Sequence, residues 1–411
     1  MRMSIGALLL AGCGEVLETP TDAPTDDAIT DSSDGPTLPT APPLTNGQAA
    51  DLAIGAPDIT TRTSGTTADT SRSAGGLCFA GEHMWISDFT NARVLQMNAP
   101  VLVFSAAADL AIGQTSLTTA TTGPTNRLLT TPAQMFETIG DVACDGTSVV
   151  VSDTSSNRIV ILNAIPAASG PTFNTVLGQT SLTGSAPATS SASLSAPRGV
   201  WTDGTRLVVA DTGNHRVLIW STFPTADAAP ADVVLGQGNF NVADAPSPPT
   251  PSSMNQPLDV FFDGERLYVS DSQNNRVMGW NGMPTQNNQP ADFFVGQAGG
   301  ATGSPNAAAG SQTPNAIGFH LPGAITVAHG SLFVVDGVNF RVVVHTPRPT
   351  SSGTSAGAVL GKSDFADGAV AAEQGLTPRG VGVQGDKVWV SDSNLALGGS
   401  RVVRYQLTNL P

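Results

Sequence analysis

An aspartate followed five residues later by an arginine recurs along this chain, and both side chains could do chemistry. The pairs are Asp88 and Arg93, Asp153 and Arg158, Asp211 and Arg216, Asp271 and Arg276, Asp336 and Arg341, and Asp392 and Arg401, the last pair with four extra residues between them. A ring of such pairs could hold a charged ligand. Alternatively, each carboxylate caps backbone N–H groups in a turn and pairs bidentately with its arginine, while the asparagines between them (Asn91, Asn214, Asn274 and Asn339) help to close the turn. Because a residue present in every internal copy serves a need that every copy shares, we expect the structural role.

The segments around each pair predict β-strands. One apolar run precedes each aspartate and another follows each arginine, as in Leu207–Val209 and Val217–Trp220, which is typical of a hairpin with a polar turn. A further run lies upstream and ends in a Gly turn, and a fourth lies downstream and ends in Gly-Gln or a similar pair. The six units begin 56 to 65 residues apart. Four strands per unit, apolar on both faces, indicate propeller blades packed between neighbours.

The two ends of the chain complement each other. The sixth unit stops at Pro411 after its third strand, whereas Ala50–Gly55 repeats the fourth-strand pattern of Ala108–Gly113. We therefore predict an all-β fold, a six-bladed β-propeller of four-stranded antiparallel blades, in which residues 50–55 close the last blade and remove its open edge.

One unit resembles a known repeat family. Pro197-Arg198-Gly199-Val200, followed by Val208–Val217 with the sequence Val-Val-Ala-Asp-Thr-Gly-Asn-His-Arg-Val, resembles an NHL repeat. The match is good in Asp271–Arg276 and degenerate elsewhere, and the pattern covers nearly all of residues 50–411. The resemblance implies an NHL-type six-bladed β-propeller over residues 50–411. Its period exceeds the roughly 40–50 residues usual for propeller repeats, and the surplus lies in the connections between units.

The N-terminus predicts export. Arg2, an apolar stretch from Ile5 to Ala11 and a small residue before Cys13 follow the layout of a secretory signal. Leu10-Ala11-Gly12-Cys13 resembles the lipobox of bacterial lipoproteins, which implies that residues 1–12 are a signal peptide and that Cys13 carries the lipid. Gly14 in place of Asp then implies an outer-membrane lipoprotein of the cell envelope. Residues 13–49, rich in Thr, Pro and Asp, predict a disordered tether.

Charge and loop composition indicate the kind of partner. The chain has 33 acidic and 18 basic residues, a net charge of −15, which argues against nucleic-acid binding. The second-to-third-strand turns and the blade-to-blade connections emerge on one side, here called the long-loop face, and loops of this length are often functional. The connections are residues 114–140, 179–197, 237–257, 297–322 and 362–378. Within the turns, Phe89, His215 and Phe340 are the candidate partner contacts, the alternative being that both phenylalanines pack beneath their own loops.

Metal and cysteine chemistry have less support. The five histidines occupy inequivalent positions, so we expect no zinc site. Calcium at Asp145, Asp203 and Asp263 stays open, although their recurrence at one turn favours turn chemistry. Cys78 and Cys144 lie three and two residues before their turn glycines, so their side chains point to opposite sheet faces and we expect no disulfide.

These patterns predict a binding module. We expect a monomeric lipoprotein without a cofactor, held to the membrane at Cys13, whose long-loop face binds a protein, peptide or glycan of the envelope. The first alternative is a propeller hydrolase or lyase with a divalent cation at the central channel, and the second is a structural spacer without a specific ligand.

Overall fold

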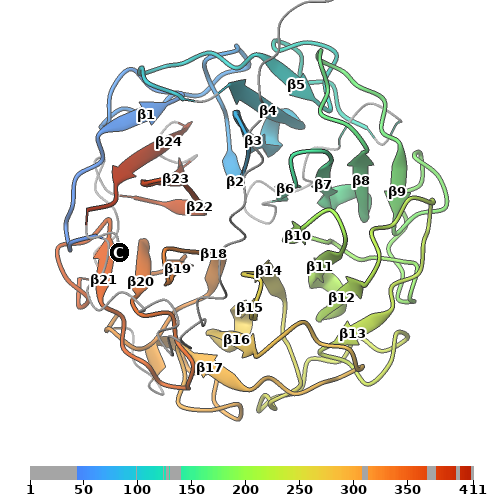
Figure 1. The fold of residues 1–411 in the computed structure, drawn as a ribbon, viewed down its shortest axis with the longest axis vertical. Helices are drawn as coiled ribbons and strands as arrows, with labels where there is room; N and C mark the ends of the chain where they lie inside the picture. The colour runs from blue at the N-terminus through green and yellow to red at the C-terminus, as the bar shows by residue number, and fades with distance from the viewer. Residues whose placement is uncertain are drawn as a thin grey trace, which may run out of the picture. The chain divides into compact units, whose positions relative to one another are not determined.

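The propeller prediction is confirmed. The computed structural model describes residues 44–98, 100–123, 125, 129, 140–307, 313–367, 376–394 and 399–408, which form six four-stranded antiparallel sheets. In Figure 1 the six sheets are arranged as blades around a common centre, with β2, β6, β10, β14, β18 and β22 innermost. Cys13 and the predicted signal lie outside the described residues. In the described part of the chain, no helix has the length and apolarity needed to cross a membrane.

In blades 1–5 the strands follow chain order from the centre outward, and in blade 6 the N-terminal strand β1 takes the outermost place. Blade 1 contains β2 (Ala74–Ala80), β3 (His83–Asp88), β4 (Arg93–Asn98) and β5 (Leu110–Ile112); blade 2 contains β6 (Val142–Cys144), β7 (Val149–Asp153), β8 (Arg158–Leu162) and β9 (Thr175–Leu177); blade 3 contains β10 (Val200–Thr202), β11 (Leu207–Asp211), β12 (Arg216–Trp220) and β13 (Val233–Leu235). Blade 4 contains β14 (Pro257–Phe262), β15 (Leu267–Asp271), β16 (Arg276–Trp280) and β17 (Phe293–Val295); blade 5 contains β18 (Pro322–Ala328), β19 (Ser331–Asp336), β20 (Arg341–His345) and β21 (Ala358–Leu360); blade 6 contains β22 (Pro378–Gln384), β23 (Lys387–Asn394), β24 (Gly399–Gln406) and β1 (Leu52–Ile54). Short 3₁₀ turns are η1 (Phe89–Asn91), η2 (Thr154–Ser156), η3 (Thr212–Asn214), η4 (Ser272–Asn274) and η5 (Pro305–Ala307).

The N-terminal strand closes the ring, as predicted. β1 pairs antiparallel with β24, with Leu52 opposite Arg404 and Ile54 opposite Val402. An ion pair of 2.9 Å between Arg404 and Asp51 reinforces this pairing. The last blade therefore has no open edge, because its outer strand comes from the other end of the domain.

The propeller begins earlier than Ala50. Leu44 is fully buried in the core between blades 5 and 6. The Asn46 side chain accepts a hydrogen bond from the Val359 N–H (2.9 Å), and the Gln48 side chain donates one to the Gln406 carbonyl (2.6 Å). Residues 44–49, which the composition assigned to the tether, are thus part of the folded domain.

The aspartate–arginine pairs organise the turns. In every blade the arginine Nε donates to the aspartate Oδ2 at 2.7–2.8 Å, and both side chains are buried. In blade 3, Asp211 also accepts hydrogen bonds from the Ser195 N–H and the Asn214 side chain. The bidentate pairing that the sequence predicted is wrong, because the other nitrogens of Arg216 donate to carbonyls of the connections on either side, at Phe240 and Ser190. Each pair therefore ties its turn to two connections.

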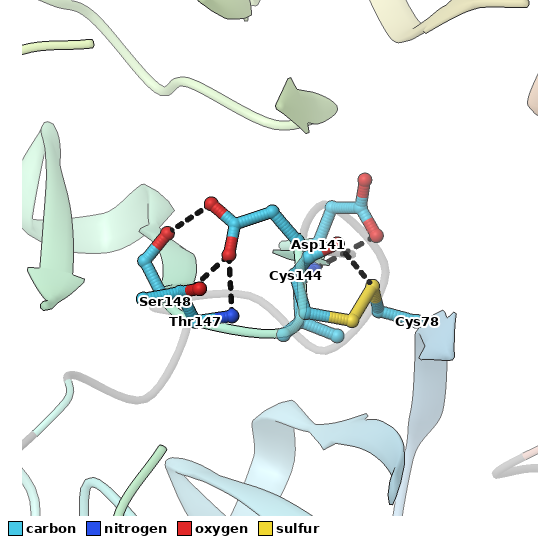
Figure 2. Close-up of a disulfide and its surroundings, with 7 residues drawn as sticks. Cys78, Asp141, Cys144, Thr147 and Ser148 are labelled. Carbon is cyan, nitrogen blue, oxygen red and sulfur yellow. Dashed lines mark hydrogen bonds between the residues drawn. A yellow bond between two sulfur atoms is a disulfide. The ribbon is translucent and has the colours of Figure 1, made fainter. Parts of the chain in front are cut away.

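A disulfide joins blades 1 and 2, contrary to the sequence prediction. Figure 2 shows the bond between Cys78 on β2 and Cys144 on β6, whose Cα atoms are 6.0 Å apart. Cys78 lies opposite Trp85 and Cys144 lies opposite Val149, so the two side chains do point to opposite faces of their own sheets. Adjacent blades, however, pack the face of one against the reverse face of the next, and Trp85 and Val149 share one core cluster. Because the two cysteines point to opposite faces of their own sheets, both side chains enter the same space between blades 1 and 2, where their sulfurs meet.

Candidate functional site

The first strands of the six blades surround a central channel. It holds a cavity of about 250 Å³ whose lining includes residues from β2, β10, β14, β18 and β22 and the segment 141–144. One position near the start of each first strand differs among blades. Its occupants, in blade order, are Gly76, Asp141, Gly199, Asp259, Ala324 and Gly380; all but Gly199 line this cavity, and Gly199 lines a smaller hollow next to it. Two carboxyl groups thus stand among small residues at one level of the channel.

The backbone of the first strands is irregular in four blades at the level of the two carboxyl groups. In four blades the pairing of the first and second strands shifts register at this point, as between Pro257 and Asp259. A β-bulge adds an unpaired residue and changes the direction of nearby side chains, and bulges are frequent beside functional sites. Pro257 pairs with Asp271, which begins the turn to the third strand, so this level lies at the long-loop face.

Asp141 and Asp259 each bridge two blades. Each side chain accepts one hydrogen bond from the N–H of the next residue, at 2.8 Å in both cases. The other oxygen of Asp141 accepts one from the Val200 N–H in blade 3 (3.2 Å), and that of Asp259 accepts one from the Ile325 N–H in blade 5 (2.7 Å). Each oxygen keeps a second lone pair for a ligand in the channel.

Burial controls the ionisation of this pair. Desolvation raises the pKa of Asp141 to about 7, although two backbone N–H groups oppose the change. Desolvation also raises the pKa of Asp259 well above its usual range, and the neighbouring Asp141 charge raises it further. Both shifts favour the protonated form of the carboxyl groups, and a protonated carboxyl group can both donate and accept hydrogen bonds.

The small residues make room for the two carboxyl groups. A Cβ atom placed on Gly76 would overlap the Asp141 carboxylate, and one placed on Gly199 would overlap the Asp259 backbone. Asp141 and Asp259 therefore leave no room for a side chain at Gly76 and Gly199, the equivalent positions of the preceding blades. This exclusion explains why aspartate occupies blades 2 and 4 but not blades 1 and 3.

Two arginines lie at the same opening. Arg198 and Arg379 line a smaller hollow of about 50 Å³ together with Asp141 and Asp259. Both arginines are half-buried, and burial lowers the pKa of Arg379, which stays a cation at neutral pH. The opening therefore presents carboxyl and guanidinium groups to one small space.

The sequence-predicted contact residues lie elsewhere on the long-loop face. Phe89 is 4% exposed and its ring lies against Gly140, which agrees with the alternative that it packs beneath its own loop. His215 is half-buried, and its Nδ1 accepts a hydrogen bond from the Gln256 N–H (3.1 Å). Phe340 is half-buried beside Lys362, whose Nζ lies 6.0 Å from the ring centre. The predicted partner contacts of His215 and Phe340 stay predictions.

The recurring first-turn aspartates perform turn chemistry. Asp145 accepts hydrogen bonds from the N–H groups of Thr147 and Ser148 (Figure 2), and Asp203 and Asp263 cap their turns in the same way. Within the described ranges, no group of three or more His, Cys, Asp or Glu side chains is arranged to hold a metal ion.

Sequence reasoning missed the channel carboxyl pair. A signal was present, because Asp141 and Asp259 occupy a position that is Gly or Ala in the other four units. Positions that differ among the units were considered in the turns, where Phe89, His215 and Phe340 lie, and not in the first strands. The register shift hid the position, since it displaces the start of the first strand relative to the turn.

Comparison with known proteins shows no family for this chain. No protein-family model matches the chain, and no curated protein matches it. Among solved structures, the aldose sugar dehydrogenase of Streptomyces coelicolor in its PQQ-bound form has 15% identity and a TM-score of 0.42, covering 85% of this chain and 99% of that one. Streptogramin B lyase has 12% identity and a TM-score of 0.40, covering 84% and 86%. The nidogen/laminin complex has 16% identity and a TM-score of 0.36, covering 71% and 85%. Likeness at this level indicates no function for this chain.

Proposed function

We propose that this chain is a binding module of the cell envelope whose channel opening on the long-loop face holds one residue of a glycan. The observation that supports this most is the Asp141 and Asp259 pair at the opening. The cavity of about 250 Å³ is smaller than the roughly 300–1,000 Å³ typical of sites that enclose a whole small ligand. A site of this size fits the end of a polymer whose remainder lies on the surrounding loops.

The chemistry of the opening suits hydroxyl groups. A sugar hydroxyl is both donor and acceptor, and a carboxyl group whose protonated form is favoured by burial offers both roles in return. Arg198 and Arg379 add donors at the rim, and Phe261 and Trp201 add partly exposed rings to the channel wall. The connections next to this opening, and His215 and Phe340 on the same face, would contact the rest of the ligand.

A panel of neutral and amino-sugar oligosaccharides tests this proposal. We expect the full chain to bind one class of oligosaccharide, and Asp259→Asn to weaken that binding at least tenfold. Asp145→Asn is the matched control, because its carboxylate caps a turn at the other end of the first strand. Melting temperatures of both variants show whether the fold is retained. The proposal is wrong if the chain binds only peptides in a parallel peptide panel, or if Asp259→Asn binds as the wild type does.

The envelope location is part of the proposal. The lipobox-like Leu10–Cys13 and the NHL-like unit around Asp211 support an outer-membrane lipoprotein with an NHL-type propeller. A disulfide between Cys78 and Cys144 also suits a compartment outside the reducing cytoplasm. The expected result is that the wild type incorporates labelled palmitate and partitions into detergent, whereas Cys13→Ser does neither. Partition of both proteins into the aqueous phase would exclude the anchor.

Catalysis is the second candidate, and the same carboxyl pair is what favours it. Two buried carboxyl groups with raised pKa values could act as acid and base, or bind a divalent cation once both are ionised. Elemental analysis of the purified chain separates these cases. Stoichiometric calcium or another divalent metal that is lost in Asp141→Asn would favour the hydrolase or lyase, whereas metal-free protein that binds glycan would favour the binding module.

A further inference from the structure

Three consecutive apolar side chains are exposed on blade 1. Leu102 is 68% exposed, Val103 is 63% exposed and Phe104 is 42% exposed. They belong to the connection between β4 and β5, and we call them the apolar tip. Single exposed hydrophobic residues are ordinary, but three in a row without a function are disfavoured in a soluble domain.

The connections in the equivalent place on other blades show what the apolar tip replaces. Each reaches back to the fourth strand of the preceding blade through a residue with positive φ, whose N–H donates to a carbonyl in the middle of that strand. These bonds join Gly170 to Ala111 (3.0 Å), Ala228 to Val176 (2.9 Å), Asn288 to Val234 (2.8 Å) and Gly353 to Phe294 (3.2 Å). The residue before each of these is polar, and its side chain accepts a hydrogen bond from the N–H of the same strand residue. The four side chains are Ser169, Asp227, Asn287 and Ser352.

We call this pair of hydrogen bonds to the preceding blade the clamp. Blade 1 keeps the backbone hydrogen bond of the clamp and lacks its polar side chain. Ser105 has φ +51 and its N–H donates to Ala53 in β1, the outer strand of blade 6. The residue before it is Phe104, whose ring cannot accept that hydrogen bond. Leu102 and Val103 stand where Thr285 and Gln286 stand in blade 4. The departure is therefore confined to the one connection that clamps the N-terminal strand.

The tether joins the propeller at this same end. Asn46 and Gly47 are the sixth copy of the clamp, since Asn46 accepts from Val359 in the fourth strand of blade 5 and Gly47 has φ +69. The first described residues, 44–49, therefore lie among the connections between third and fourth strands, opposite the long-loop face, and the lipobox-like segment precedes them in the sequence. No charged residue occurs from Asn98 to Ala108.

We propose that Leu102, Val103 and Phe104 insert into the interfacial region of the bilayer to which the lipidated chain is anchored. The inference rests on the proposed lipid anchor. An anchor raises the local concentration of the propeller at the bilayer, so a small apolar contact is enough to orient it. Contact through the apolar tip would turn the long-loop face, with the Asp141 and Asp259 opening, away from the membrane.

A single fluorescent label tests the apolar tip. Cys78 and Cys144 are joined and Cys13 would carry lipid, so Val103→Cys provides the one free thiol for an environment-sensitive dye. The full lipidated chain is reconstituted into vesicles of phosphatidylethanolamine and phosphatidylglycerol (3:1), with and without spin-labelled lipid. Val338→Cys is the matched control, because Val338 is 39% exposed and lies in the turn between β19 and β20 on the long-loop face.

The expected result is a blue shift and at least twofold quenching by spin-labelled lipid at position 103, and neither at position 338. If the protein floats with the vesicles but the label at position 103 stays unquenched, the proposed insertion of the apolar tip is wrong, whereas the proposed lipid anchor is not contradicted. Protein that does not float with the vesicles overturns both. A blue shift that needs no vesicles and rises with protein concentration identifies contact between two copies instead, and likewise overturns the proposal. Loss of the blue shift in Leu102→Ser with Phe104→Ser, at an unchanged melting temperature, would support it further.

Discussion

Arg62 and Asp392 form an ion pair of 3.0 Å between the N-terminal connection and the last blade. Asp392 therefore pairs with two arginines, because Arg401 also donates to it at 2.7 Å, and both ion pairs are buried. Arg62 follows β1, the strand that closes the ring. The closure thus combines backbone pairing with a buried charge contact that joins the two ends of the domain.

Replacement of Arg62 by alanine should loosen this closure. Asp392 keeps Arg401 and the Thr377 N–H, so we expect a loss of about 1–3 kcal/mol, the range for a charged hydrogen bond. Arg72→Ala in the same connection is the control, since Arg72 is exposed and should change stability by less than about 0.5 kcal/mol. Urea unfolding measures both, and equal effects would show that Arg62 does not brace the closure.

Arg216→Ala should destabilise the propeller without changing what it binds. Removal of one partner from a buried ion pair leaves Asp211 uncompensated, which costs about 3–5 kcal/mol. Arg206→Ala is the matched control in the same blade, because its ion pair with Asp203 is about 30% exposed and worth about 0–1 kcal/mol. Thermal unfolding gives the stability and the oligosaccharide assay gives the binding. A stable Arg216→Ala protein that no longer binds would restore the functional reading of the repeat.

The sequence is sufficient for whatever repeats. The aspartate–arginine pair, for example Asp211 and Arg216, recurs in every unit. Its structural role in the turn, the number of blades and the closing strand at Leu52–Ile54 all follow from this repeat. Features present once or twice are harder to predict. The disulfide between Cys78 and Cys144 depends on how neighbouring blades face each other, and Asp259 follows an irregular strand start. The burial of Leu44 in the propeller core was not predicted, because the residues around it have the composition of a disordered tether.

Loss of the disulfide should lower stability at unchanged fold. The bond closes a loop of 66 residues, for which the chain-entropy estimate is about 4 kcal/mol at most. We expect Cys78→Ala with Cys144→Ala to melt at a lower temperature, and reductant to lower the wild type to the same value. Reductant should leave the double variant unaffected, which is the internal control. Alkylation of both cysteines in the native, unreduced protein would contradict the bond.

Gly76→Ala should damage the channel level that holds the carboxyl pair. Its methyl group would overlap the Asp141 carboxylate and approach the Asp141 backbone, so the site must shift. We expect a loss of about 1–3 kcal/mol, as for overpacked sites, together with weaker oligosaccharide binding. Gly238→Ala is the control, because an added Cβ there meets nothing within 4 Å and its φ is not positive. Unchanged stability and binding in Gly76→Ala would show that the level tolerates a further side chain next to Asp141.

His345 should make the stability depend on pH. The imidazole is fully buried on β20 with its ring edge toward Phe319, and burial lowers its pKa from 6.5 to about 4. The unfolded chain therefore takes up a proton near pH 6.5, whereas the folded protein does so only near pH 4. The contribution of the neutral His345 to the free energy of unfolding is therefore fully present above pH 6.5. It is lost as the pH falls toward 4, which lowers the free energy of unfolding by about 3 kcal/mol in total.

The comparison with His345→Leu isolates this effect. Asp141 and Asp259 have raised pKa values and act in the opposite direction across part of the same range, but they are present in both proteins and cancel in the difference. Urea unfolding at pH 4.5, 5.5, 6.5 and 7.5 should show the wild type losing stability relative to His345→Leu as the pH falls. A constant difference between wild type and His345→Leu would mean that the pKa of His345 is the same in the folded and unfolded chain, which would contradict the effect of burial.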